Sequence, residues 1–155
     1  MAPWRIASAI VGILLVLVYA FGANYWNRPD GWYQSLQKPS WQPPGFIFGI
    51  IWPYNFIVLG FALYIIASRA NPLIVGASLA FAAISIASAL RWSYVFYSKH
   101  DLHAAEISLL TTAIMTLPVL ALAFTQSLKI GIALIPYQLW LFTAAAIAHN
   151  YVSNN

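Results

Sequence analysis

Long apolar runs dominate the pattern of residues along this chain. Lys, Arg, Asp and Glu are so sparse that five long charge-free stretches remain, at residues 6–27, 39–68, 70–90, 107–128 and 130–155. An α-helix of about 20 apolar residues crosses the hydrocarbon core of a bilayer, so each stretch is long enough to span. The runs are continuously apolar and lack the alternation typical of a membrane β-barrel. The pattern therefore predicts an all-α, polytopic membrane protein with a bundle of five transmembrane helices.

We expect one domain over residues 1–155, with helices at about residues 5–24, 45–68, 72–97, 103–127 and 131–151. The first run resembles a secretory signal peptide, because Arg5 precedes it and small residues follow. It is long for that role, and four more spans follow, so we interpret it as a retained helix.

The first loop, at about residues 25–44, is the one long connection. Loops of more than about 12–15 residues without regular structure are usually functional or disordered. This loop is rich in proline, which restricts the backbone, and in aromatic side chains, which favour burial. We therefore expect it to be ordered and to fold over the bundle as a lid.

Composition supports a membrane location and excludes several partners. The chain has 155 residues, of which 62% are hydrophobic and only 6% charged, whereas about 25% are charged in soluble domains. We expect an integral, multi-pass protein surrounded by membrane lipid. The net charge of +4 is spread thinly, and without a basic cluster nucleic acid is excluded as a partner. The absence of cysteine excludes disulfides and thiol chemistry.

The basic residues do not orient the chain. With side A defined as the end that holds the N-terminus and side B as the other, three basic residues lie at side A and four at side B. This difference is too small for the positive-inside rule to decide the orientation.

The third predicted helix carries small residues spaced 4, 3 and 4 apart, namely Gly76, Ala80, Ala83 and Ala87. This spacing places them on one helix face, where another helix can approach closely. The face suits packing inside the bundle and a homodimer equally well, and we carry the homodimer forward as a prediction.

Three tryptophans lie too deep in their helices for an interfacial belt. Trp52, Trp92 and Trp140 are about 12, 9 and 16 Å from the side B ends of the second, third and fifth helices. Three helices therefore bring an indole into the half of the bilayer below the first loop. One step of i, i+4 adds Phe56, Phe96 and Ala144 to the same faces.

Such an aromatic stripe is most often core packing, but the first loop above it favours a pocket for a large, flat, apolar ligand. Pockets commonly lie between the helices of a bundle. Trp32, Tyr33, Trp41 and the prolines of the loop would then form the roof of this pocket.

The stretch "WYQSLQKPSWQPPGFIFGIIW" resembles the signature of the TspO/translocator protein family, also called tryptophan-rich sensory proteins or peripheral-type benzodiazepine receptors. The family pattern is matched at Trp32, Tyr33, Lys38, Pro39, Trp41, Pro43, Pro44 and Trp52. "WSYVFY" at 92–97 and "IPYQLW" at 135–140 resemble the family's third-helix and fifth-helix motifs. The resemblance covers residues from about 20 to 150.

The resemblance implies a five-helix bundle, often a homodimer, that binds porphyrins, sterols and synthetic isoquinolines under the first loop. The expected ligand is a porphyrin (protoporphyrin IX or haem) or another hydrophobic small molecule, with no required cofactor. Together with the aromatic pattern, it predicts ligand contacts at Tyr33, Trp41, Pro43, Trp52, Phe56, Trp92, Phe96, Trp140 and Ala144.

The leading functional hypothesis is a receptor or carrier of tetrapyrroles. An enzyme that degrades bound porphyrin with light and oxygen is an alternative, with Trp52 and Trp140 as the reactive indoles. A sterol or lipid transporter is another, although no basic residue follows Tyr137 or Tyr151 to complete the family's C-terminal sterol motif. A structural protein whose aromatic core is only packing is the last. No nucleophile elbow or spaced triad indicates a conventional hydrolase.

Arg91 departs from the family pattern and lies inside a predicted span, where an unpartnered charge is costly. We favour a pair with Glu106, which lies at similar depth across the next turn. A porphyrin propionate is the alternative partner. The nearby "HDLHAAE" at 100–106 does not have the spacing of a known metal site. We predict no metal there and interpret Asp101 as a helix N-cap.

Overall fold

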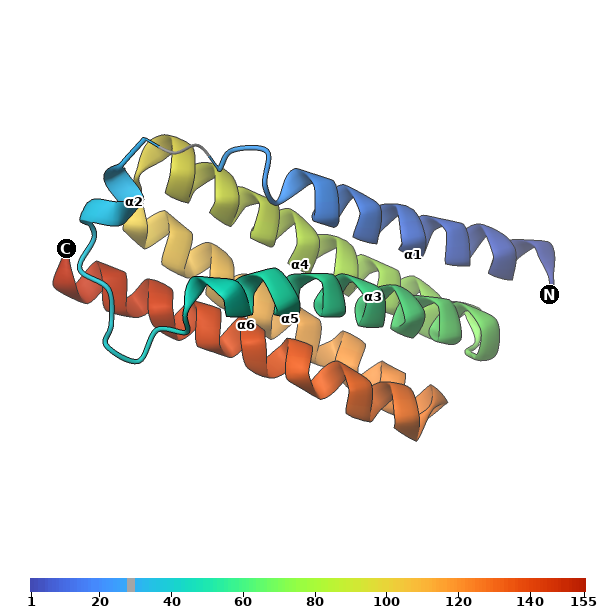
Figure 1. Cartoon of the computed structure of the whole chain (residues 1–155). Helices are drawn as coiled ribbons and strands as arrows, with labels where there is room; N and C mark the ends of the chain where they lie inside the picture. The colour runs from blue at the N-terminus through green and yellow to red at the C-terminus, as the bar shows by residue number, and fades with distance from the viewer. Residues whose placement is uncertain (28–29) are drawn as a thin grey trace.

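The computed structural model describes residues 1–27 and 30–155, and within them it contains helices and no strands. Five long helices run side by side, and a short one lies near one end of the bundle (Figure 1). They are α1 (Pro3–Gly22), α2 (Trp32–Ser35), α3 (Gly45–Arg69), α4 (Pro72–Lys99), α5 (Leu102–Gln126) and α6 (Leu128–Asn154). Each long helix is long and apolar enough to cross a membrane. The predicted all-α bundle of five transmembrane helices is confirmed.

The helix ends follow from capping side chains. Side-chain oxygens of Asn71, Asp101 and Ser127 accept hydrogen bonds from backbone N–H groups in the first turns of α4, α5 and α6. Such caps satisfy donors that the helix itself leaves free. The N-cap expected at Asp101 is therefore confirmed. At the other end of α4, His100 has φ of 55°, so the chain leaves the helix in a left-handed conformation and α5 begins two residues later.

The long helices form a closed ring in the order α1, α3, α6, α5, α4. The helices of the pairs α4–α5 and α5–α6 are antiparallel neighbours joined by short turns, α1 packs against α3 and α4, and α3 packs against α6. The N-terminus lies at side A, whereas the C-terminus, α2 and the first loop (now residues 23–44) lie at side B (Figure 1). Residues 28 and 29 of this loop, including the side B cation Arg28, lie outside the described residues.

The core changes character along the bundle. In the half nearer side A it consists of small and aliphatic side chains with no measurable exposure, among them Ala62, Ile66, Val119, Ala123 and Leu134. Near the middle, the Ser85 and Thr116 hydroxyls join α4 to α5 with an Oγ–Oγ1 distance of 2.7 Å. The half nearer side B contains the aromatic residues described below.

The small face of α4 points away from the bundle. Gly76, Ala80 and Ala87 are exposed, and Ala83 is half-buried. A Cβ at Gly76 would meet no atom within 4 Å. This face is therefore not used for packing inside the bundle, and the homodimer stays a prediction.

Candidate functional site

A cavity of about 840 Å³ opens in the side B half of the bundle, between α3, α4 and α6 and beneath the first loop. This volume is in the range of about 300–1,000 Å³ found for small-molecule sites. Eight of the nine predicted ligand contacts line this aromatic cavity: Tyr33, Pro43, Trp52, Phe56, Trp92, Phe96, Trp140 and Ala144. Three helices thus bring the three deep indoles to one space.

The walls are made of paired rings. In α3, Trp52 and Phe56 stack with centroids 5.7 Å apart, and in α4 Trp92 and Phe96 do the same at 5.7 Å. Both pairs follow from the i, i+4 spacing, which places two side chains one above the other on a helix face. On α6, Trp140 packs edge-on against Phe48 at 5.0 Å. The rings hold one another in place and leave their inner surfaces to the cavity.

Glycine and proline on α3 leave room for this space. Gly45 and Gly49 lie one helical turn apart on the wall, and a Cβ at either would meet no atom within 4 Å. Pro53 also lines the cavity, directly after Trp52. Because proline has no backbone N–H, it leaves the carbonyl four residues earlier without its helical partner. Gly49 and Phe48 lie one helical turn before Trp52, so helical spacing could have identified both as wall residues from the sequence.

Trp41 and Trp32 do not line the cavity, so the predicted roof is partly wrong. Trp41 is 52% exposed. It lies in a turn closed by a hydrogen bond from the Gln42 N–H to the Pro39 carbonyl, and this turn leaves its side chain exposed. Trp32 lies in α2 and packs edge-on against Phe96 at 5.0 Å, behind the cavity wall.

The first loop is fastened to the turn between α4 and α5 through Trp32. Its indole stacks on the His100 ring with centroids 4.1 Å apart, and His100 Nε2 lies 2.9 Å from Asp30 Oδ2. The backbone N–H of Trp32 donates to Asp30 Oδ1 at 3.0 Å. This N–H, and then His100, holds the pKa of the exposed Asp30 carboxyl below its ordinary value.

The same loop is fastened to the end of α6 by polar side chains. The Tyr151 hydroxyl donates to Gln42 Oε1, and Gln42 Nε2 donates to the Tyr33 hydroxyl at 3.1 Å. The Asn155 side chain pairs with the backbone of Gln37, accepting from its N–H at 2.8 Å and donating to its carbonyl at 3.3 Å. These contacts support the predicted lid in the described part of the loop.

Several polar residues that line the cavity were not predicted from the sequence as site residues: Asn24, Asn27, Lys38, Gln42, Tyr97 and Tyr151. For Tyr151 a signal existed, since it continues the helical steps from Trp140 through Ala144 and Ala148 along one face of α6. For Lys38 and Gln42, which lie in the first loop, no periodic signal exists.

Arg91 does not pair with Glu106, and that prediction is wrong. Arg91 Nη1 donates to the Ala104 carbonyl at 3.1 Å and to the Ser108 hydroxyl, both on α5. Glu106 instead meets His149 of α6, with 2.7 Å between Oε1 and Nδ1. Glu106 lies at the depth of Arg91, as predicted, but its side chain is turned toward α6. Nor does Arg91 line the aromatic cavity, so the structure offers no support for a propionate contact there.

Below the cavity, at the middle of the bundle, lies a set of fully buried polar side chains. The Tyr137 hydroxyl faces those of Tyr19, Ser85 and Thr116, so four helices contribute to this layer. Tyr19 also packs edge-on against Trp52 at 5.9 Å, which makes it the support of the cavity wall. Within residues 1–27 and 30–155, neither the nitrogen nor the oxygen of the Asn55 amide has a hydrogen-bond partner.

Comparison with known proteins places this geometry in a family. Residues 7–152 match the model of the TspO/MBR family. The uncharacterized membrane protein YtaB of Bacillus subtilis is 31% identical, over 94% of this chain and 97% of its own. The translocator protein of Bos taurus is 29% identical over 100% of this chain and 94% of its own. The tryptophan-rich sensory protein of Cereibacter sphaeroides is 25% identical over 77% of this chain and 74% of its own.

Proposed function

This chain belongs to the TspO/MBR family of multi-pass membrane proteins, and from that premise we propose that it is a receptor or carrier for porphyrins and related flat, apolar ligands. The observation that carries the proposal is the convergence of Trp52, Trp92 and Trp140, from three helices, on one cavity of about 840 Å³. Indole faces are suited to stacking on a planar aromatic macrocycle. The names of two relatives, translocator protein and tryptophan-rich sensory protein, are compatible with a role in carrying or sensing such a ligand.

Titration of the purified protein with protoporphyrin IX in the dark tests this function. Because the indoles line the cavity, a bound porphyrin should quench their emission, and the quenching should saturate at one porphyrin per chain. Emission that falls linearly without saturation would contradict a defined site and would leave the aromatic cavity as packing alone.

A second candidate function uses the same indoles for chemistry. Trp52 and Trp140 face the cavity that would hold the porphyrin, so light absorbed by the porphyrin could drive its oxidation by oxygen beside them. Illumination of the complex in air tests this activity. Light-dependent loss of the porphyrin absorption that disappears in Trp52→Phe and Trp140→Phe would support an enzyme. Loss at the rate of free porphyrin would leave a binding protein.

We also propose that a second copy of the chain packs on the small face of α4. The exposed Gly76 and Ala80 support this, because small residues at such spacing let two helix backbones approach closely in a membrane. Gly76→Leu should convert a dimer to a monomer, as measured by crosslinking in bilayers. Gly60→Leu, at a half-buried glycine of α3 whose Cβ would likewise meet no atom within 4 Å, is the control. A wild-type monomer in bilayers would contradict the proposal.

A further inference from the structure

We propose that Lys38 binds a carboxylate of the ligand, so that the aromatic cavity selects flat, apolar molecules that carry an acid group. The inference rests on the proposed function, because it takes the cavity to be the ligand site. It adds the chemical class of the ligand, and it assigns to Lys38 the role that the sequence suggested for Arg91.

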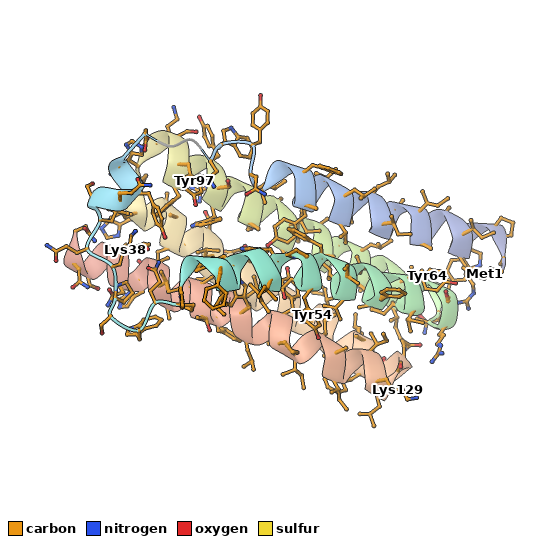
Figure 2. The ribbon with its side chains drawn as sticks, viewed as in Figure 1. Met1, Lys38, Tyr54, Tyr64, Tyr97 and Lys129 are labelled. Carbon is orange, nitrogen blue, oxygen red and sulfur yellow. The ribbon has the colours of Figure 1, made fainter. Side chains whose placement is uncertain are left out.

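Lys38 lies at the mouth of the cavity. It belongs to the part of the first loop between α2 and α3, and it lines the cavity together with Tyr33 and Tyr97. Figure 2 shows Lys38 and Tyr97 at the side B end of the bundle, whereas Lys129 lies at the opposite end. The Lys38 Nζ is 4.2 Å from the centroid of the Tyr33 ring. This cation–π contact holds the ammonium near the opening and occupies one side of the ammonium. N–H donors on its other side remain for another group.

Within residues 1–27 and 30–155, no carboxylate pairs with Lys38. Among the described residues that line the cavity, Lys38 alone has a formal charge, and no carboxylate is among them. The ion pairs in the described part of the chain join His100 to Asp30 and His149 to Glu106, and neither includes Lys38. Attraction between opposite charges is stronger beside an apolar cavity than in bulk water. A ligand carboxylate is the group that would complete this site.

A second donor lies beside the ammonium. In the chain of hydrogen bonds from Tyr151 through Gln42 to Tyr33, the Tyr33 oxygen accepts from the Gln42 amide. The Tyr33 O–H proton is not used in the contact with Gln42, and the neighbouring hydroxyl in the protein is that of Tyr151. The orientation of the Tyr33 hydroxyl is set by Gln42, so little freedom is lost when it donates to a ligand. An ammonium and a hydroxyl at the mouth of the cavity complement a carboxylate, which has two acceptor oxygens.

The cavity also has a direction that fits such a ligand. Its deep part consists of Trp52, Trp92 and Trp140, and its mouth holds Lys38 and Tyr33. The ring system would lie among the indoles with the acid toward side B. Of the other cations, Arg91 already donates to α5 and lies outside the cavity lining.

The decisive experiment compares protoporphyrin IX with its dimethyl ester, which has the same ring and no acid. Affinities for both are measured in the dark in wild type, Lys38→Gln and Arg91→Gln. We expect wild type to bind the free acid about tenfold more tightly, the order of magnitude of one charge-assisted contact. Lys38→Gln should lose this preference through weaker binding of the acid, with ester affinity unchanged, and Arg91→Gln should keep it. Added salt should reduce the preference in wild type.

Ester affinity also reports whether a variant still has its cavity. If Lys38→Gln loses both ligands, Lys38→Arg provides the test, because it restores the charge and should restore the preference for the acid. Tyr33→Phe keeps the ring beneath the ammonium and removes the hydroxyl, so it should reduce the preference in part. A preference that survives in Lys38→Gln, or equal binding of acid and ester in wild type, overturns the inference and leaves the proposed function standing. Saturable binding of neither compound overturns the proposed function itself.

Discussion

The two halves of this bundle are made by the same five helices and yet differ in what lies between them. Toward side A, small and aliphatic residues such as Ala62 and Ala123 close the space completely. Toward side B, rings from α3, α4 and α6 surround about 840 Å³ of open volume. In the side B half, the rings are held in position by stacking against one another and by the first loop. The comparison shows that side-chain size and the glycines of α3, rather than the order of the helices, determine where this fold is hollow.

The largest difference between the two halves is expected when the same large side chain is placed in each. Ala62→Phe should cost about 1–3 kcal/mol in stability, because a closed core cannot accept the ring without displacing its neighbours. Gly49→Phe should leave stability nearly unchanged, because no atom lies within 4 Å of its Cβ position, and it should abolish porphyrin binding by filling the cavity. Thermal unfolding in detergent and porphyrin titration measure the two effects. Equal destabilisation by both variants would contradict the contrast.

A second test concerns the polar layer that separates the halves. Asn55→Leu should raise stability by about 1–2 kcal/mol, because it removes a buried amide without partners in the described structure and replaces it with an apolar side chain of similar shape. Ser85→Ala is the control and should lower stability, since the Ser85 hydroxyl is bonded to Thr116. Thermal unfolding of both variants provides the measurement. Destabilisation by Asn55→Leu would mean that its amide is satisfied in the membrane.

A third test separates the cavity indoles from an indole at the surface. Trp52→Ala and Trp140→Ala should each weaken porphyrin affinity by a few-fold to tenfold, in line with about 0.5–1.5 kcal/mol for an aromatic pair. Trp4→Ala should have no effect, because Trp4 lies in the first turn of α1 at side A, where its ring contacts Arg5. The measurement is a dark titration of each variant. Equal losses in all three would argue against a localised site.

The smallest effect is expected where the first loop meets the α4–α5 turn. Because the pKa of Asp30 is lowered in the folded protein, its contribution to holding α2 is present above its unfolded pKa of about 3.9 and is lost as pH falls through the lower folded value. The chain contains no cysteine, so a spin label at Gln34→Cys can report the mobility of α2. Mobility should increase below about pH 4, and Asp30→Asn should remove that increase. A pH-independent signal would show that the Asp30 carboxylate does not contribute to holding α2.

The helices could be predicted from the sequence because a membrane span needs an unbroken apolar run, and the charges mark where each run ends. The depth of Trp52, Trp92 and Trp140 followed from residue counting, and so did their convergence. What failed was rotation about the helix axis and the conformation of the loop. Glu106 has the depth expected for Arg91, but it faces α6, and counting along one helix does not show which neighbour lies on that side.

The first loop poses a different difficulty. Whether Trp41 points outward depends on one turn, and whether Lys38 reaches the cavity depends on contacts with α6 far along the chain. The four residues of α2 are too few to leave a periodic signal. No local pattern encodes such positions.

The fastening of the first loop to Tyr151 and Asn155 also imposes an order on biogenesis. Both residues follow every other part of the cavity in the chain, so the loop is synthesised long before the residues that hold it at α6. Until α6 has inserted, neither the third indole nor this fastening exists. A nascent chain with four helices in the membrane therefore has an open aromatic groove, and the protein can enclose a ligand only once its last helix is in place.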